Sequence, residues 1–137
     1  MVDRISVEST VKASPARVWD ALADPAARAQ WWPGMTFEPV SGGSLREQWS
    51  EAGLDYVAHG TVREVEPEQL LRFTWSDASW EAPTTVTVTL QPALSATLVR
   101  ITEQGLAQLS QGSEVAREHE AGWRWHLDRL REHVEFH

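Results

Sequence analysis

Cysteine is missing from this sequence of 137 residues, and the chain has no long run of apolar residues. The lack of cysteine excludes disulfides, thiolate metal sites and cysteine nucleophiles. The polar, alternating start MVDRISVEST lacks the apolar stretch of a signal peptide, and nothing approaches the roughly 20 apolar residues of a transmembrane helix. We therefore expect a cytoplasmic protein with no membrane partner.

Positive charge is also scarce, because the sequence has 12 Lys and Arg residues against 20 Asp and Glu residues, which gives a formal net charge of −8. Such a surface repels nucleic acid and anionic membranes, so we expect no nucleic-acid partner. The sequence also lacks a phosphate-binding glycine loop and the motifs HExxH and GxSxG. Tryptophan, by contrast, is abundant, and eight such residues in a short chain indicate a bulky apolar interior.

The length fits a single domain over residues 1–137 with one hydrophobic core. Residues 4–13 alternate between apolar and polar side chains, which predicts a half-buried strand. Ser14–Pro15 and Asp24–Pro25 each place proline after an N-cap residue, so they predict two short helices, the second ending at Pro33–Gly34. The chain is therefore expected to begin with one strand and two helices.

Strands are predicted to follow without interruption between Met35 and Gly105, six in all, separated by short turns such as residues 41–43 and 51–55. The segment TTVTVTL at 84–90 is the clearest of them, with its valines on one face and threonines on the other. Closely spaced strands of this kind are typical of consecutive antiparallel pairing.

The last segment, from Ser113 to about Val134, is predicted to be one long helix. At 100° per residue, its apolar side chains form a narrow stripe of Ala116, Trp123, Leu127, Leu130 and Val134. A helix with such a stripe must cover one face of the sheet. We therefore predict an α+β fold in the order β-α-α-β-β-β-β-β-β-α, in which a curved antiparallel sheet of about seven strands encloses an apolar cavity with the helix.

Several segments carry a resemblance to a known family, in the family's order: ASPARVWDALADPAARAQWWPG, Gly42–Gly43, GTVREVEPEQLLRFTW, TVTVTL, TLVRITEQGL and GWRWHLDRL. The sequence resembles the START-like helix-grip (SRPBCC) superfamily over essentially its whole length. It is most similar to the bacterial branch named after the activator of the heat-shock-protein-ninety ATPase. The resemblance implies a helix-grip fold but no single function, because the superfamily includes lipid carriers, hormone receptors and polyketide cyclases. Members often carry histidine at the position of Glu103, so this residue departs from the family's pattern.

The candidate ligand contacts are the side chains predicted to face the cavity: Trp32, Trp49, His59, Phe73, Trp75, Val86, Val88, Val99, Ile101, Glu103, His119, Trp123, His126 and Leu127. A carboxylate on this face is costly without a partner, so Glu103 is weighed equally as a ligand contact and as the partner of an arginine or of solvent. For Glu47, which lies between Leu45 and Trp49, we favour the arginine-paired or solvent-exposed position. The direction of His59 stays open, because Gly60 can mark a bulge that reverses the alternation.

His119, His126 and His133 recur every seven residues, at the edge of the predicted apolar stripe. Seven residues span about 10.5 Å of helix, which is too far for two of these rings to share a zinc ion. We therefore expect no metal and no tightly bound cofactor, and we expect the rings to line the edge of the helix–sheet interface.

These features together favour a domain that binds a small hydrophobic or aromatic molecule. One alternative is a polyketide cyclase-like or hydrolase-like enzyme, in which Glu103 and either His59 or His126 act as acid and base within hydrogen-bonding reach. The other alternative, implied by the family name, is a co-chaperone that activates a heat-shock ATPase in the stress response. Trp80 and Trp125 are predicted to be exposed, which indicates a partner surface such as that of a homodimer.

Overall fold

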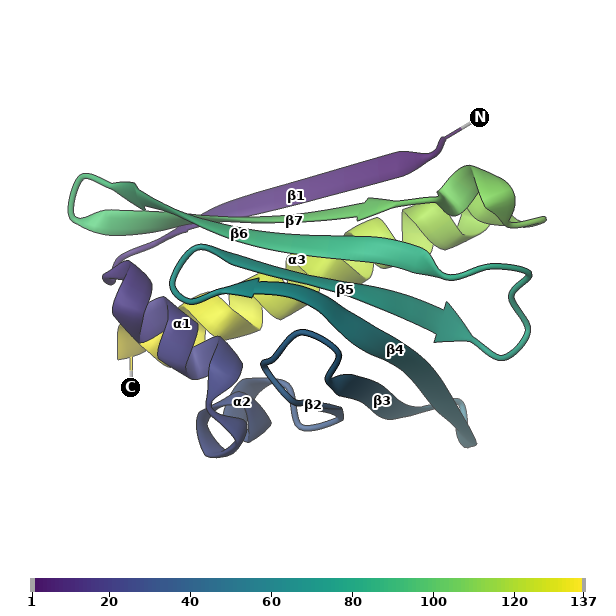
Figure 1. Cartoon of the computed structure of the whole chain (residues 1–137), viewed down its shortest axis with the longest axis horizontal. Helices are drawn as coiled ribbons and strands as arrows, with labels where there is room; N and C mark the ends of the chain where they lie inside the picture. The colour runs from purple at the N-terminus through teal and green to yellow at the C-terminus, as the bar shows by residue number, and fades with distance from the viewer. Residues whose placement is uncertain (1, 137) are drawn as a thin grey trace.

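A computed structural model describes residues 2–136 as a seven-stranded antiparallel sheet with three α-helices (Figure 1). In chain order the elements are β1 (Arg4–Val11), α1 (Pro15–Ala23), α2 (Pro25–Trp31), β2 (Met35–Phe37), β3 (Ser44–Glu51), β4 (Leu54–Glu66), β5 (Leu70–Asp77), β6 (Thr84–Ala93), β7 (Ala96–Gln104), the short 3₁₀ helix η1 (Leu106–Gln108) and α3 (Gly112–Phe136). This is the α+β fold, in the element order, that the sequence predicts. None of the helices between residues 2 and 136 has the length and apolar character needed to cross a membrane.

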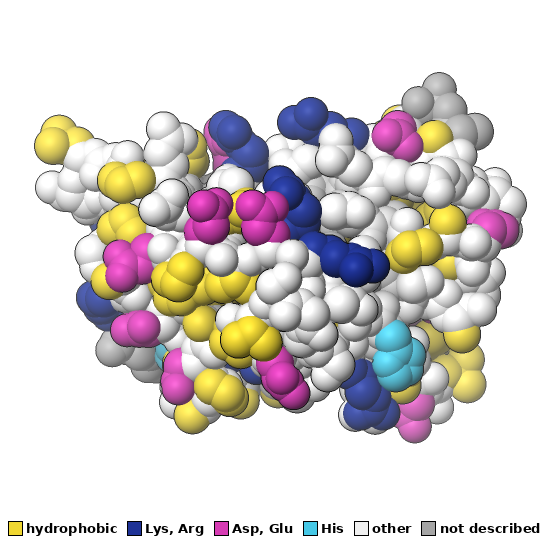
Figure 2. Space-filling view, in the orientation of Figure 1, with side chains coloured by type: hydrophobic (Ala, Val, Ile, Leu, Met, Phe, Trp, Pro, Cys, Tyr) yellow, Lys and Arg dark blue, Asp and Glu magenta, His cyan; other side chains and the backbone are white. Residues whose placement is uncertain are grey.

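The strands of the sheet lie in the order β1-β7-β6-β5-β4-β3-β2. Strands β2 to β7 each pair with the next along the chain, as predicted, whereas β1 pairs with β7. α3 lies diagonally across one face, which we call the inner face, and α1 and α2 lie at one end (Figure 1). Figure 2 shows basic and acidic side chains side by side on the opposite, outer face, where Arg72 pairs with Glu64.

Both short helices begin where the sequence predicts. The hydroxyl of Ser14 accepts a hydrogen bond from the backbone N–H of Arg17 at 3.3 Å, and the carboxylate of Asp24 accepts one from Ala27 at 2.9 Å. Proline occupies the first turn of each helix, where its missing N–H costs no hydrogen bond. These signals act between near neighbours in the chain, so they need no tertiary contact to locate the helices.

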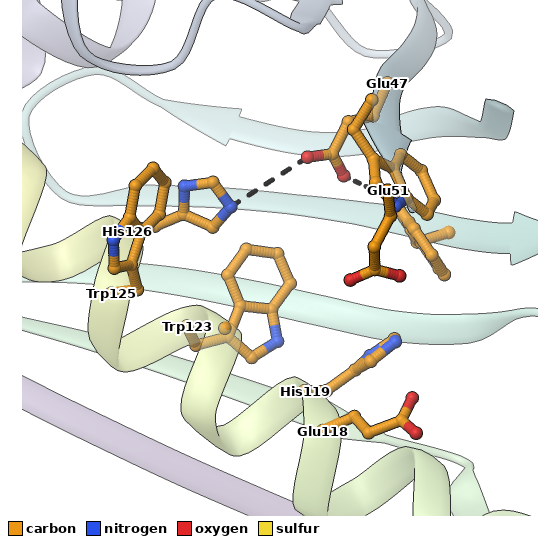
Figure 3. A pocket seen from close by; sticks show the side chains of 10 residues that line it. Glu47, Glu51, Glu118, His119, Trp123, Trp125 and His126 are labelled. Carbon is orange, nitrogen blue, oxygen red and sulfur yellow. Dashed lines mark hydrogen bonds and ion pairs between the residues drawn. The ribbon is translucent and has the colours of Figure 1, made fainter. Parts of the chain in front are cut away.

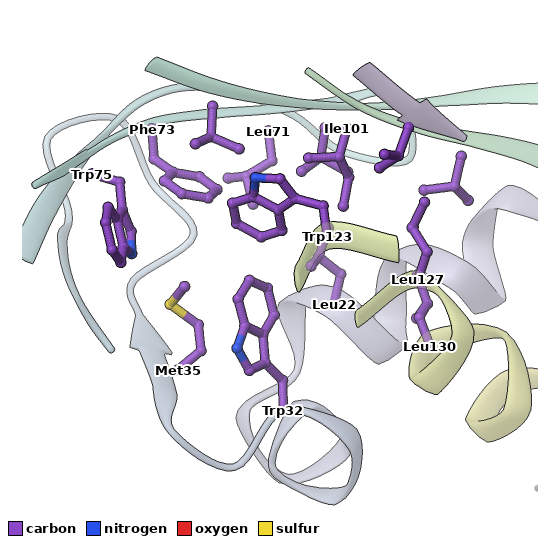
Figure 4. Close-up of a cluster of buried hydrophobic side chains, with 14 of the residues drawn as sticks. Leu22, Trp32, Met35, Leu71, Phe73, Trp75, Ile101, Trp123, Leu127 and Leu130 are labelled. Atoms are coloured by element: carbon purple, nitrogen blue, oxygen red, sulfur yellow. The ribbon is translucent and has the colours of Figure 1, made fainter. Parts of the chain in front are cut away.

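The apolar stripe of α3 packs directly on the inner face of the sheet. Its members are at most 6% exposed: Ala116, Trp123, Leu127, Leu130 and Val134. Figure 4 shows the indole of Trp123 beside Leu71, Phe73 and Ile101 of the sheet. Burying each large apolar side chain contributes roughly 1.5–3 kcal/mol, so this contact holds the helix on the sheet. The part of the helix–sheet interface that contains this stripe is therefore packed core.

β4 determines the direction of His59. Its residues alternate regularly from Ala58 to Val62, and the register shifts only beyond that point, between Val62 and Glu64. Ala58 and Val62 are buried on the inner face, so His59 points outward and is exposed. A Cβ at Gly60 would lie 1.7 Å from the carbonyl oxygen of Thr74, so glycine is needed there for close strand approach and not for a bulge. The direction of His59, which the sequence left open, is therefore outward, away from the cavity side of the sheet.

Candidate functional site

An open cleft of about 420 Å³ lies between α3 and strands β3 and β5 (Figure 3). Its wall combines indole rings with acidic and imidazole side chains, and the lining residues are Glu47, Trp49, Glu51, Trp75, Glu118, His119, Gly122, Trp123, Trp125 and His126. β3, β5 and α3 are distant in the sequence, so the cleft exists only once the sheet has formed and the helix has packed on it.

Two small residues leave room for this cleft. A Cβ added at Gly122, on the helix side, would meet no atom within 4 Å. On the sheet side, Ala58 of β4 pairs with Glu47 of β3, and its short side chain lets Glu47 reach across to β5. There Glu47 Oε1 accepts a hydrogen bond from the indole N–H of Trp75 at 3.2 Å. The side chains of Glu47 and Trp75 therefore meet next to the small residue Ala58 and form the floor of the cleft.

Glu47 is held in this floor by two indole donors. Besides Trp75, the indole N–H of Trp32 donates to Glu47 Oε2 at 2.9 Å. Burial raises the pKa of Glu47, and the two indole hydrogen bonds offset this only in part. The expectation that Glu47 reaches solvent or an arginine is thus wrong. The available signal was its alternation with Leu45 and Trp49, which places it on the inner face.

His126 lies beside Glu47 on the opposite wall. Its Nε2 is 3.9 Å from Glu47 Oε2, too long for a hydrogen bond, and its ring centroid is 4.3 Å from that of Trp32. Its Nδ1 is buried and has no hydrogen-bond partner within residues 2–136. Burial lowers the pKa of His126 to about 4, so the ring is neutral at neutral pH.

Glu103 forms a second, fully enclosed cluster. Its Oε1 accepts from the indole N–H of Trp123 at 2.9 Å and lies 2.8 Å from His119 Nδ1, while Oε2 accepts from the hydroxyl of Thr84 at 2.6 Å. Burial favours the neutral acid, but the hydrogen bond and charge of His119, with those of Thr84 and Trp123, outweigh it and lower the pKa of Glu103. Neither an arginine nor solvent is its partner. Glu103 instead holds in place two side chains that line the cleft.

The aromatic wall is continuous. The ring of Trp49 is stacked on that of Trp75, with ring centroids 6.0 Å apart. The ring of Trp75 also contacts that of Trp80, with ring centroids 5.0 Å apart. Trp80 is half-buried in this contact, so its predicted exposure is wrong. Trp125 is 56% exposed, as predicted, but it is among the residues that line the cleft and does not point away from it. The guanidinium of Arg129 lies 5.6 Å from the centre of its ring.

The predicted ligand contacts separate into groups. Those that line the cleft are Trp49, Trp75, His119, Trp123 and His126. Trp32 and Glu103 lie behind the wall and hydrogen-bond to its residues. Six others are buried in the packed core and are not among the described residues that line the cleft: Phe73, Val86, Val88, Val99, Ile101 and Leu127. The sequence treats the whole inner face as cavity, whereas α3 packs on part of it and makes these six side chains core.

The acid and base that the sequence suggests are not neighbours. Glu103 contacts His119, not His126, and His59 lies on the other side of the sheet. Among the carboxylates and imidazoles that line the open cleft, Glu47 Oε2 and His126 Nε2 lie 3.9 Å apart. Within residues 2–136, no three His, Asp or Glu side chains are grouped as a metal site would require. The arrangement presents ring faces and carboxylates to whatever enters the cleft.

The family described as Activator of Hsp90 ATPase homolog 1-like protein matches residues 12–135, and the chain belongs to this family. Among solved structures it is similar to Mll3558 from Rhizobium loti, with 27% identity, a TM-score of 0.82 and 95% of each chain covered. It is 29% identical to DynU16, a protein in the dynemicin biosynthetic locus, with a TM-score of 0.84. That match covers 98% of this chain and 48% of DynU16, so this chain spans about half of DynU16's length.

The Aha1 dimer from Colwellia psychrerythraea is 20% identical, with a TM-score of 0.78 and coverage of 98% of this chain and 97% of that one, and it shows the shared fold. No curated protein matches this sequence. The match to the family model and to the solved structures confirms the family resemblance seen in the sequence.

Proposed function

We propose that this member of the Activator of Hsp90 ATPase homolog 1-like family is a binding protein that holds a flat aromatic molecule in the cleft between α3 and strands β3 and β5. The observation that carries the proposal is an open space of about 420 Å³ with indoles on its walls. Sites for small molecules measure roughly 300–1,000 Å³ and combine apolar walls with a few polar groups. The size and the lining therefore both fit a small aromatic ligand.

The indoles are held in position before any ligand arrives. Glu47 holds the ring nitrogen of Trp75, and Glu103 holds that of Trp123. Side chains that are already immobile lose little conformational entropy when a ligand binds, so their contacts contribute more to affinity. Stacking on a fixed ring also favours ligands that are planar.

Gly122→Leu provides a direct test. A Cβ at this position meets no atom within 4 Å, so the added side chain starts in open space and narrows the cleft. We expect isothermal titration calorimetry to detect binding of 2-naphthalenemethanol to the native protein and to detect no binding to Gly122→Leu. Ala121→Leu is the matched control, because Ala121 is exposed and is not among the cleft-lining residues. Equal binding to Gly122→Leu, or failure of the native protein to bind any flat aromatic probe, whether neutral or charged, would contradict the proposal.

A second candidate function, acid–base chemistry on the bound molecule, is favoured by Glu47 and His126. Burial raises the pKa of Glu47, which favours its protonated form, and lowers the pKa of His126 to about 4, which favours its neutral, proton-accepting form. Hydrolysis of 4-nitrophenyl acetate measures whether the pair is reactive. We expect the native rate to exceed that of both Glu47→Gln and His126→Phe, and three equal rates would reject this function.

A further inference from the structure

The cleft is acidic as well as aromatic. Glu47, Glu51 and Glu118 line it, and no lysine or arginine is among its described lining residues. Figure 3 shows Glu47 and Glu51 projecting from β3 and Glu118 from α3, so the carboxylates come from both sides of the opening. Glu51 and Glu118 are exposed at the mouth, whereas Glu47 is mostly buried in the floor.

The two histidines of the cleft do not cancel this negative charge. His126 is neutral at neutral pH, because burial lowers its pKa to about 4. His119 contacts the fully buried carboxylate of Glu103 at 2.8 Å, so a positive charge on its ring is matched by that carboxylate. His119 is the cleft residue whose charge also acts on Glu47, and no lysine or arginine is opposite the carboxylates of Glu47, Glu51 and Glu118 among the described lining residues.

The faces of the indole rings in the cleft also favour a positively charged ligand. The face of an indole carries partial negative charge and attracts cations within about 6 Å of its centre. The protein itself makes such a contact at the rim, where the guanidinium of Arg129 lies 5.6 Å from the ring centre of Trp125. Deeper in the cleft, the walls present Trp49, Trp75 and Trp123 beside the carboxylates. A ligand with positive charge would be attracted by both kinds of group.

We propose that the cleft selects organic cations, in which a flat apolar body lies against the indoles and a protonated amine or quaternary ammonium group lies among Glu47, Glu51 and Glu118. This inference rests on the proposed function and adds the charge of the ligand to it. A neutral or anionic ligand of the same shape would lose the attraction of the carboxylates, and an anion would also be repelled by them.

Three naphthyl probes of similar size test the charge preference. They are the cation (2-naphthylmethyl)trimethylammonium, the neutral 2-naphthalenemethanol and the anion 2-naphthylacetate, each titrated by calorimetry at about 0.15 M salt to screen distant charges. We expect the cation to bind about tenfold more tightly than the neutral probe, and the anion to bind most weakly. Equal affinities for cation and neutral probe overturn the charge preference and leave the proposed function standing. No binding of any probe overturns both.

The double variant Glu51→Gln with Glu118→Gln localises the preference to the cleft. Both residues are exposed, so the fold does not depend on their charge. We expect the ratio of cation to neutral affinity to fall towards one. The control is Glu66→Gln with Glu114→Gln, which removes the same charge from one strand and one helix at positions that are not among the cleft-lining residues. If both double variants lower the ratio equally, the preference comes from overall charge and the proposal is wrong.

Discussion

Two carboxylates on the inner face of one sheet have opposite environments. Glu103 on β7 and Glu47 on β3 each lie near a histidine of α3 and accept hydrogen bonds from tryptophan indoles. Glu103 is fully enclosed and is bonded by three residues, whereas Glu47 has two indole donors and borders an open cleft. The pKa is lowered at Glu103, where the hydrogen bonds outweigh burial, and raised at Glu47, where they do not.

The difference shows that the number of partners, more than the residue type, decides what a buried carboxylate does. Glu103 has its hydrogen-bonding capacity used by Thr84, His119 and Trp123, so it stabilises the wall of the cleft. The carboxylate of Glu47 also borders the cleft, so a bound ligand can interact with it directly. Buried polar groups that lack full satisfaction are costly to stability and are commonly kept for binding or chemistry.

The largest effect is expected when Glu103 is changed to glutamine. The amide keeps only one acceptor oxygen, so its NH2 group must face either the Thr84 hydroxyl, which then has to accept instead of donate, or the indole N–H of Trp123, and the negative charge beside His119 is lost in a fully buried site. We expect a loss of roughly 3–4 kcal/mol in the free energy of unfolding, measured by urea denaturation. A loss of less than about 1 kcal/mol would show that the cluster does not need its charge.

The next effect is the pH dependence due to His126. Its pKa is about 4 in the folded protein, below the ordinary value of 6.5, so the unfolded chain binds more protons between these values. The contribution of His126 to the free energy of unfolding is therefore fully present above pH 6.5. It is lost as the pH drops towards 4, by up to roughly 2–3 kcal/mol. His126→Phe removes this dependence. Urea unfolding of both proteins at several pH values measures it, and parallel curves would contradict it.

Glu47→Gln is expected to change stability much less than Glu103→Gln. Because burial raises the pKa of Glu47, ionisation of this group destabilises the fold as the pH rises through that value. An uncharged side chain avoids this cost, but its amide NH2 cannot accept from one of the two indole N–H groups that Glu47 binds, so the two effects offset each other. We expect a net change of no more than about 1 kcal/mol at pH 7 in urea denaturation, together with weaker binding of the cationic probe. A large loss of stability would remove the contrast between the two carboxylates.

The smallest effect concerns the glycine in the cleft wall. Alanine has the higher helix propensity, and a Cβ at Gly122 meets no atom within 4 Å. Gly122→Ala is therefore expected to stabilise the protein by about 0.5–1 kcal/mol in thermal unfolding. The matched comparison is Gly60→Ala, where the Cβ would lie 1.7 Å from the Thr74 carbonyl oxygen and must destabilise the sheet. Destabilisation by both changes would mean that Gly122 also serves packing.

The sequence by itself determined the α+β order, the starts of α1 and α2 and the apolar stripe of α3. Each depends on neighbours in the chain: Ser14 and Asp24 cap their own helices, and strand and helix periodicities place residues on faces. The same periodicity put Glu47 and Glu103 on the inner face. It could not distinguish them, because their partners come from other elements.

Only the tertiary structure decided which inner-face residues line a cleft and which form core. α3 packs closely on one part of the sheet and leaves space along β3, so Val86 and Ile101 became core while Trp49 and Trp75 border the opening. The number of donors around each carboxylate was fixed by the same packing. Alternation assigns a face to a side chain, but cavity and charge state depend on how far the opposing helix lies from that face.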